Sequence, residues 1–167
     1  MATRKEIIKR GLCSWIFTVA DNSDASGDAP FYELSGFSQV NTYSAIIDKV
    51  AAERKVDPRL VKAIMYMETT HGYYDAPLSW AGKNKSILPM NINVDYWGDT
   101  FGTRQDMQDP EKNIRAGVEM IFRIQANMTG APVEKIATLY NNINATKVNN
   151  YGMRVKKIYD EQPWVSK

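Results

Sequence analysis

The chain has 167 residues, of which 44% are apolar and 24% are charged, and its formal net charge is +2. These values predict one globular domain rather than a disordered chain. The nearly balanced charge argues against nucleic-acid binding, because a protein that binds nucleic acid needs a concentrated basic face. With one cysteine and one histidine, the chain lacks metal motifs such as CxxC and HExxH, and no apolar run approaches about 18 residues. We therefore expect no metal, no organic cofactor and no membrane span.

The first 20 residues are open to two interpretations. An apolar stretch from Leu12 to Ala20 follows a basic beginning, which is the outline of a signal peptide. Apolar residues also recur at spacings of three and four, as on one face of a helix. They are Ile8, Leu12, Trp15, Ile16 and Val19. Because Glu6 is unusual in the basic region of a signal peptide, the pattern favours a helix over residues 1–20 that packs on the domain.

Several segments further along the chain have the pattern of helices. Asp-Pro pairs at 57–58 and 109–110 each provide an N-cap followed by proline at the first helical position. The predicted helices span about residues 42–55, 58–72, 110–128, 132–140 and 148–161. Residues 73–108 are rich in glycine, proline and aromatic residues without a period, so we expect loops there with at most a short irregular element. The predicted fold class is mostly α.

Glu68 lies near the end of the predicted helix 58–72, in the stretch YMETTHG. On a helical projection of about 100° per residue it falls inside the apolar stripe, close to Val61 and Ile64. Burial there would raise the pKa of its carboxyl group, and an acid that keeps its proton near neutral pH is what a general acid requires. The alternative is a structural buried glutamate that is paired with an arginine or capped by backbone amides. The aromatic segment that follows suits a sugar, whose C–H faces stack on rings.

A series of short motifs follows in chain order between residues 42 and 160. They are Val56–Ile64 leading to Glu68-Thr69, Ser79-Trp80-Ala81-Gly82, Leu88–Ile92, Asp109–Gly117, Leu139-Tyr140-Asn141 and Tyr151–Val155. Their order and spacing resemble the soluble lytic transglycosylases, a branch of the lysozyme-like superfamily. The chain departs from that pattern in having Thr69 for serine, Asn91 for glutamine and Leu88-Pro89 for Gly-Leu.

The resemblance implies a single lysozyme-like helical domain over residues 1–167, with a long irregular loop region at the cleft. Residues 1–41 would be an N-terminal extension and residues 42–160 the catalytic core. The substrate would be the glycan strand of peptidoglycan, cut at the β-1,4 bond between N-acetylmuramic acid and N-acetylglucosamine. Glu68 would be the general acid. The residues implied to line the neighbouring subsite are Thr69, Ser79, Asn91, Tyr140 and Asn141.

The number of catalytic carboxylates decides the product. Glycosidases commonly use a pair of them, and the candidates for a second one in the loop region are Asp75, Asp95 and Asp99. The resemblance to lytic transglycosylases implies a different mechanism, in which one acid works alone and the C6 hydroxyl of the sugar attacks to give a 1,6-anhydro product. The residues favour a single-Glu enzyme, and hydrolysis versus transglycosylation stays open.

Two other kinds of protein fit parts of the pattern. One is a glycan-binding module without catalysis, and the other is a helical interaction protein whose aromatic loop docks a partner. Delivery is a separate question, because a wall-cutting enzyme must act in the periplasm. A small wall hydrolase made in the cytoplasm without a signal peptide resembles the toxins that bacteria inject into competitors by type VI secretion, and phage tail lysozymes are a second possibility. Such a toxin would imply a cognate immunity protein.

Overall fold

The computed structural model describes residues 2–13, 16–28, 39–70, 86–87 and 89–165, and over these ranges the chain is mostly α-helical. The helices are α1 (Arg4–Arg10), α2 (Gln39–Thr42), α3 (Ser44–Arg54), α4 (Pro58–Thr70), α6 (Val94–Phe101), α7 (Arg104–Met107), α8 (Pro110–Ala126), α9 (Val133–Asn141) and α10 (Asn150–Glu161). Two short strands, β1 (Ser86–Ile87) and β2 (Ile92–Asn93), pair antiparallel, with Ser86 opposite Asn93. None of the helices within these ranges is long and apolar enough to cross a membrane.

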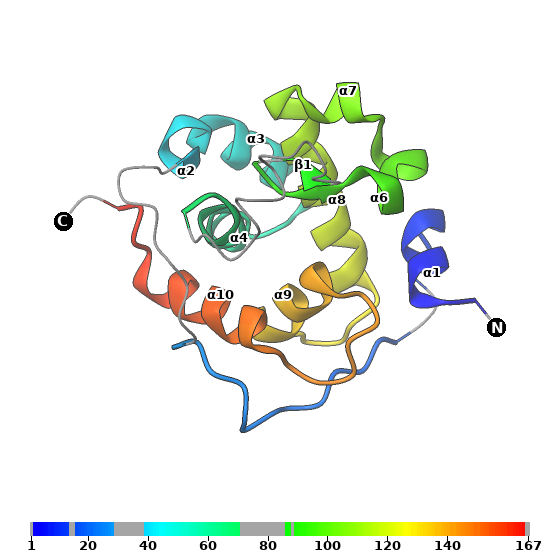
Figure 1. Cartoon of the computed structure of the whole chain (residues 1–167), viewed down its shortest axis with the longest axis vertical. Helices are drawn as coiled ribbons and strands as arrows, with labels where there is room; N and C mark the ends of the chain where they lie inside the picture. The colour runs from blue at the N-terminus through cyan, green and yellow to red at the C-terminus, as the bar shows by residue number, and fades with distance from the viewer. Residues whose placement is uncertain (1, 14–15, 29–38, 71–85, 88, 166–167) are drawn as a thin grey trace.

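Helix α4 runs through the middle of the molecule, with α3 on one side and α9 and α10 on the other (Figure 1). Its start follows the predicted pattern, because Asp57 Oδ1 accepts a hydrogen bond from the backbone N–H of Arg59 (2.9 Å) and Pro58 is the first helical residue. Every residue of α4 from Leu60 to Thr69 is buried except Lys62. A helix that is apolar on nearly every side belongs inside a core, and α4 is such a helix.

Helices α8, α9 and α10 complete the core around α4. The side chain of Asp109 caps α8 by accepting from the backbone N–H of Lys112 (3.1 Å). Helices α9 and α10 approach closely at Gly152, where an added Cβ atom would lie 2.1 Å from Thr138 Oγ1 and 2.3 Å from the carbonyl oxygen of Glu134. Glycine is therefore required at this position, and the close contact fixes the beginning of α10, where Tyr151 lies.

The prediction of one helix over residues 1–20 is wrong beyond Arg10. Helix α1 ends there because Gly11 adopts the left-handed conformation (φ +67°) and its N–H closes the helix end. The described residues 11–13 and 16–20 are not helical, and Leu12 (36% exposed) and Ile16 (75% exposed) lie at the surface although the predicted stripe needs both buried. Ile8 and Val19 are buried as predicted, whereas Trp15 lies outside the described residues.

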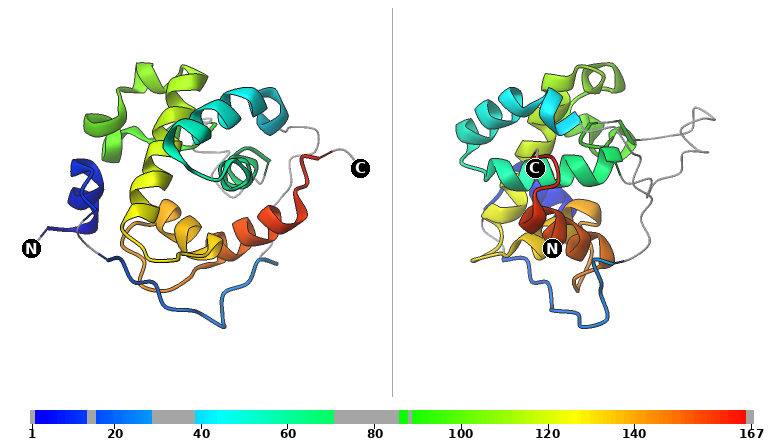
Figure 2. Two further views of the ribbon diagram at one scale, coloured as in Figure 1. Left: turned by 180° about the vertical axis from the view of Figure 1, so that it is seen from behind. Right: turned by 90° about the vertical axis from the view of Figure 1, so that its left-hand side faces the viewer.

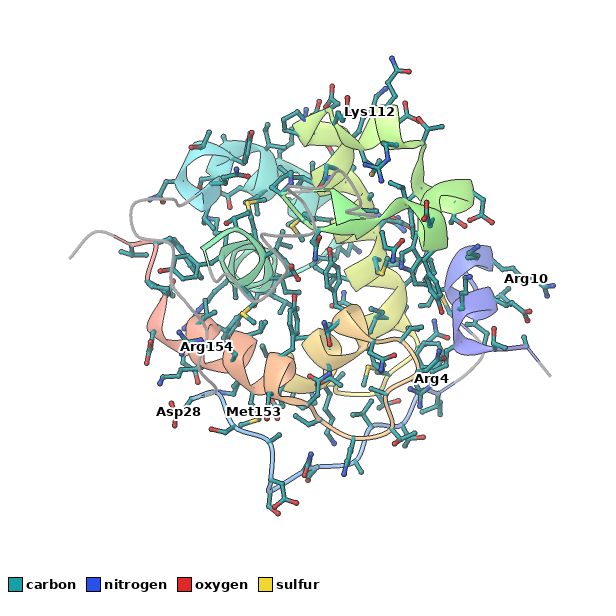
Figure 3. All side chains as sticks on the ribbon, viewed as in Figure 1. Arg4, Arg10, Asp28, Lys112, Met153 and Arg154 are labelled. Atoms are coloured by element: carbon teal, nitrogen blue, oxygen red, sulfur yellow. The ribbon has the colours of Figure 1, made fainter. Side chains whose placement is uncertain are left out.

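The described parts of the N-terminal segment are nevertheless bound to the domain at several points. Figure 2 shows residues 16–28 passing along the outside of α9 and α10, whereas α1 packs beside α8. The Arg4 guanidinium donates to the carbonyl oxygens of Ile143 (3.1 Å) and Ala145 (2.6 Å), at the position labelled in Figure 3. Further along, Ala20 forms a parallel β-bridge with Lys147. These contacts join the segment to the connection between α9 and α10.

The expectation of loops over residues 73–108 is wrong for residues 94–107, which form α6 and α7. Both helices begin at polar caps: Asn93 Oδ1 accepts from the backbone N–H of Tyr96 (3.1 Å), and Thr103 and Asp106 form a capping box. Gly102, with φ +137°, separates them. Helices this short show too few turns for an apolar period to be visible in the sequence. Residues 73–85 lie outside the described residues.

Candidate active site

Glu68 lies two residues before the end of α4 and keeps only 8% of its surface exposed. The helical projection therefore placed it on the correct, buried side. Burial raises the pKa of its carboxyl group from 4.5 to about 7, and hydrogen bonds from Tyr151 and Asn91 oppose this rise only in part. Burial dominates because a charged carboxylate loses its hydration in the apolar surroundings of α4. The side chain is therefore an acid that is close to half protonated at neutral pH.

The partners of Glu68 are both neutral. Tyr151 Oη donates to Glu68 Oε1 (2.5 Å), and Asn91 Nδ2 donates to Glu68 Oε2 (2.8 Å). Within the part of the chain that the structure describes, no lysine or arginine forms an ion pair with this carboxyl group. The structural alternatives for Glu68, an ion pair with arginine and capping by backbone amides, thus find no support among these residues. Each carboxyl oxygen has a second lone pair that remains available for a proton.

Tyr151 reaches Glu68 from the first turn of α10 and is 1% exposed. The side chain of Asn149 caps this helix by accepting from the backbone N–H of Gly152 (2.8 Å). Sequence reasoning missed Tyr151 as a site residue and used it only as the first residue of a motif. The available clue was a buried tyrosine, whose hydroxyl must find a polar partner inside the protein. Nothing local, however, indicates which partner that is.

Asn91 and Tyr140 converge on the same site from different elements. Asn91 precedes β2 and adopts a left-handed conformation (φ +58°), which asparagine tolerates better than most residues. Tyr140, at the end of α9, donates its hydroxyl to the carbonyl oxygen of Met90 (2.7 Å). Burial and the nearby charge of Glu68 together raise the pKa of Tyr140 well above its usual value. Both residues therefore belong to the Glu68 site.

The other predicted substrate-lining residues are placed differently. The hydroxyl of Thr69 donates to the carbonyl oxygen of Met65 (2.8 Å) within α4, and the residue is buried. Asn141 is exposed at the end of α9, where its Oδ1 accepts from Asn149 Nδ2 (3.2 Å). Neither residue donates to the carboxyl group of Glu68. Ser79 lies outside the described residues.

Two of the three candidates for a second carboxylate, Asp95 and Asp99, lie on α6, and both are exposed. Asp99 forms an ion pair with Lys9 of α1 (2.7 Å), and this pairing lowers the pKa of Asp99. Its side chain is 69% exposed. Asp95 lies one turn earlier on the same helix and is also exposed. Asp75 lies outside the described residues. Asp99 is thus committed to joining α1 and α6 and is not enclosed as Glu68 is.

A separate pocket of about 500 Å³ lies between α3, α6, α7 and α8. Its lining includes the charged residues Glu53, Arg54, Arg115 and Glu119, which form two ion pairs, Arg54 with Glu119 and Arg115 with Glu53. Neither Glu68 nor any of its hydrogen-bond partners lines this pocket. Among the described residues, no group of three His, Cys, Asp or Glu side chains could hold a metal ion.

Comparison with known proteins adds no relative. No protein-family model matches the chain, and it has no significant match among curated proteins or solved structures.

Proposed function

We propose that this protein is a peptidoglycan glycosidase with a lysozyme-like fold, in which Glu68 is the general acid. The bond cleaved is the β-1,4 bond between N-acetylmuramic acid and N-acetylglucosamine. The observation that carries the proposal is a buried carboxyl group with a pKa of about 7, held by two neutral donors at the end of the central helix. An acid of this pKa combines a substantial protonated fraction at neutral pH with a strong tendency to give up its proton.

The partners of Glu68 suit both stages of a proton transfer. While the acid is protonated, the amide of Asn91 and the hydroxyl of Tyr151 keep the plane of the carboxyl group fixed. When the proton passes to the glycosidic oxygen, both groups donate to the new carboxylate, and hydrogen bonds to a charged acceptor are the stronger ones. Donors that are already in place stabilise the developing charge without reorganisation. Asn91 and Tyr151 therefore act as positioning and stabilising groups.

Glu68 is the only buried acidic side chain among the residues that the structure describes, which favours the 1,6-anhydro product. In that reaction Glu68 protonates the glycosidic oxygen, and the bond from this oxygen to C1 breaks. The C6 hydroxyl oxygen of the same muramic acid then bonds to C1, and its proton returns to the Glu68 carboxylate. No water is consumed, so no second carboxylate is needed. The exposed positions of Asp95 and Asp99 support this route over hydrolysis.

The test is digestion of purified peptidoglycan sacculi by the wild type and by Glu68→Gln, followed by mass spectrometry of the released muropeptides. We expect fragments that end in 1,6-anhydro-N-acetylmuramic acid, lighter by one water than reducing sugars, and no release by the variant. Reducing ends alone would establish hydrolysis and refute the single-carboxylate route. Binding of sacculi without release by either protein would refute the enzyme and support a glycan-binding module instead.

A further inference from the structure

The turn that carries Asn91 is held by side chains from distant parts of the chain. The residue before it, Met90, has both of its backbone polar groups bonded in this way. Its N–H donates to Oδ1 of Asn113 on α8 (2.9 Å), and its carbonyl oxygen accepts from the hydroxyl of Tyr140 on α9 (2.7 Å). The peptide groups on either side of Met90 are therefore fixed relative to two long helices.

The side-chain amide of Asn113 can accept from the N–H of Met90 in one orientation only. The residue is completely buried, and its Nδ2 donates to the carbonyl oxygen of Met107 at the end of α7 (3.0 Å). Turning the amide over would place its NH₂ group against the Met90 N–H and its oxygen against the Met107 carbonyl. Both pairs would then repel, and buried polar groups would lose their partners. Asn113 thus joins the end of α7 to the turn at Met90 in a defined geometry.

The side chain of Met90 is fixed against the same face of α8. It is completely buried, and it lies so close to Gly117 that an added Cβ atom there would be 2.8 Å from Met90 Cε. Gly117 follows Asn113 by one helical turn, so the two residues face the turn together. The backbone and the side chain of Met90 are therefore both set by α8.

We propose that Asn113 is a positioning residue for Glu68, which fixes the Met90–Asn91 turn so that the Asn91 amide points at Glu68 Oε2. Asn91 needs such support because its left-handed conformation (φ +58°) is one that non-glycine residues rarely adopt without constraint from their surroundings. The catalytic meaning of this role rests on the proposed function, but the geometry does not. An apolar residue such as leucine would fill the same volume without burying an amide, and it would leave the direction of the Met90 N–H unspecified.

The decisive variant is Asn113→Leu, and the chain offers a matched control at the other end of the same helix. Asn127 is also a buried asparagine, and its Nδ2 donates to the carbonyl oxygens of Leu12 and Arg123, away from the Glu68 site. The measurement is the titration of the Glu68 side-chain carboxyl followed by ¹³C NMR, with the signal assigned by its loss in Glu68→Gln. This readout requires no turnover. It therefore remains informative even if sacculi are not digested, and the two proposals can fail separately.

Asn113→Leu should raise the titration midpoint of Glu68, because the bond from Asn91 that lowers the pKa of Glu68 would be weakened. The loss of one hydrogen bond to a charged group corresponds to a shift of up to about one pH unit. Asn127→Leu should leave the midpoint unchanged. Asn91→Ala should raise it as well, and Asn113→Leu should add nothing further in that background, since both changes remove the same bond.

An unchanged midpoint in folded Asn113→Leu would overturn the proposal, as would an equal shift in Asn127→Leu or additive shifts in the double variant. Should Asn113→Leu fail to fold, Gly117→Ala decides the question from the other side of the turn. Its methyl group displaces Met90, so it too should raise the midpoint, and no shift in that variant would overturn the proposal equally.

Discussion

Two glutamates in different regions of this protein have opposite titration behaviour. Glu53, near the end of α3 and on the rim of the pocket beside α8, forms an ion pair with Arg115 (2.6 Å). That bond lowers the pKa of Glu53. Glu68, near the end of α4, is buried between neutral donors, and its pKa is raised to about 7. Both residues lie near the end of a helix, so this position alone does not explain the difference.

The contrast shows that the nearest donors and the access of water decide whether a carboxyl group favours its charged or its neutral form. A guanidinium partner at the surface favours the charged form of a carboxylate, whereas burial without a cation favours the neutral acid. The pocket between α3, α6, α7 and α8 has a volume of about 500 Å³, yet its charged side chains are largely used to join helices to one another. The size of a hollow is therefore a poorer guide to chemistry in this protein than the environment of each acid.

The largest expected effect comes from removing each acid in turn. Glu68→Gln should lower the rate of sacculus digestion by about 10²–10⁴-fold, because the amide keeps the shape but cannot donate the proton. Glu53→Gln should leave the rate unchanged. Both variants should fold, which circular dichroism checks. Comparable losses of activity in the two variants would show that the different environments of the two glutamates do not determine their roles in the reaction.

Stability should depend on pH through Glu68. Between about pH 4.5 and 7 the folded protein keeps a proton on Glu68 that the unfolded chain releases. The stabilising effect of this bound proton is therefore complete below about pH 4.5 and is lost as pH rises through 7. Relative to Glu68→Gln, the wild type should lose about 3 kcal/mol of unfolding free energy between pH 4 and pH 9. Urea unfolding of both proteins at several pH values measures this, and parallel pH curves would contradict the raised pKa.

Glu68 can be given an environment like that of Glu53 by placing a cation beside it. Asn91→Lys brings an ammonium group to the position from which the Asn91 amide contacts Glu68 Oε2. The pKa of Glu68 should fall, and at neutral pH the rate should drop by about 100-fold, with partial recovery toward pH 5. Asn91→Ala is the control for loss of the amide alone. A loss of activity that is the same at every pH in the lysine variant would show that ionisation of Glu68 is not its cause.

The smallest effect should come from the exposed ion pair. Arg115→Met removes the partner of Glu53, and exposed pairs of this kind contribute little to stability. We expect the melting temperature to stay within about 2 °C of that of the wild type. A larger drop would show that the ion pairs around the pocket hold α3 on α8 more strongly than surface pairs usually do.

The sequence was sufficient where structure is determined locally. The beginnings of α4 and α8 follow from Asp57-Pro58 and Asp109-Pro110, and the buried side of Glu68 follows from the apolar residues on either side of it along α4. The end of α1 could also have been predicted, because Gly11 is a typical helix terminator. The stripe of apolar residues that continued past Gly11 obscured it.

Contacts between distant residues could not be predicted in the same way. The hydroxyl of Tyr151 meets Glu68 across 83 positions of sequence, and Asn113 meets Met90 across 23. Such pairings depend on how helices pack, and no local pattern specifies them. Asn113 lies near the start of α8 within the Asp109–Gly117 motif, and nothing in that motif indicates its bond to the site. Asn91 entered the predicted site through the family resemblance rather than through its surroundings.

In the proposed mechanism a neutral Glu68 supplies the proton for bond cleavage. The most direct test measures kcat/KM for peptidoglycan fragments as a function of pH and, on the same protein, the ¹³C titration of the Glu68 carboxyl. We expect the rate to fall as pH rises through a midpoint near 7 and this midpoint to coincide with the titration of Glu68. A Glu68 midpoint below 5, or a rate that stays constant while Glu68 loses its proton, would contradict the claim.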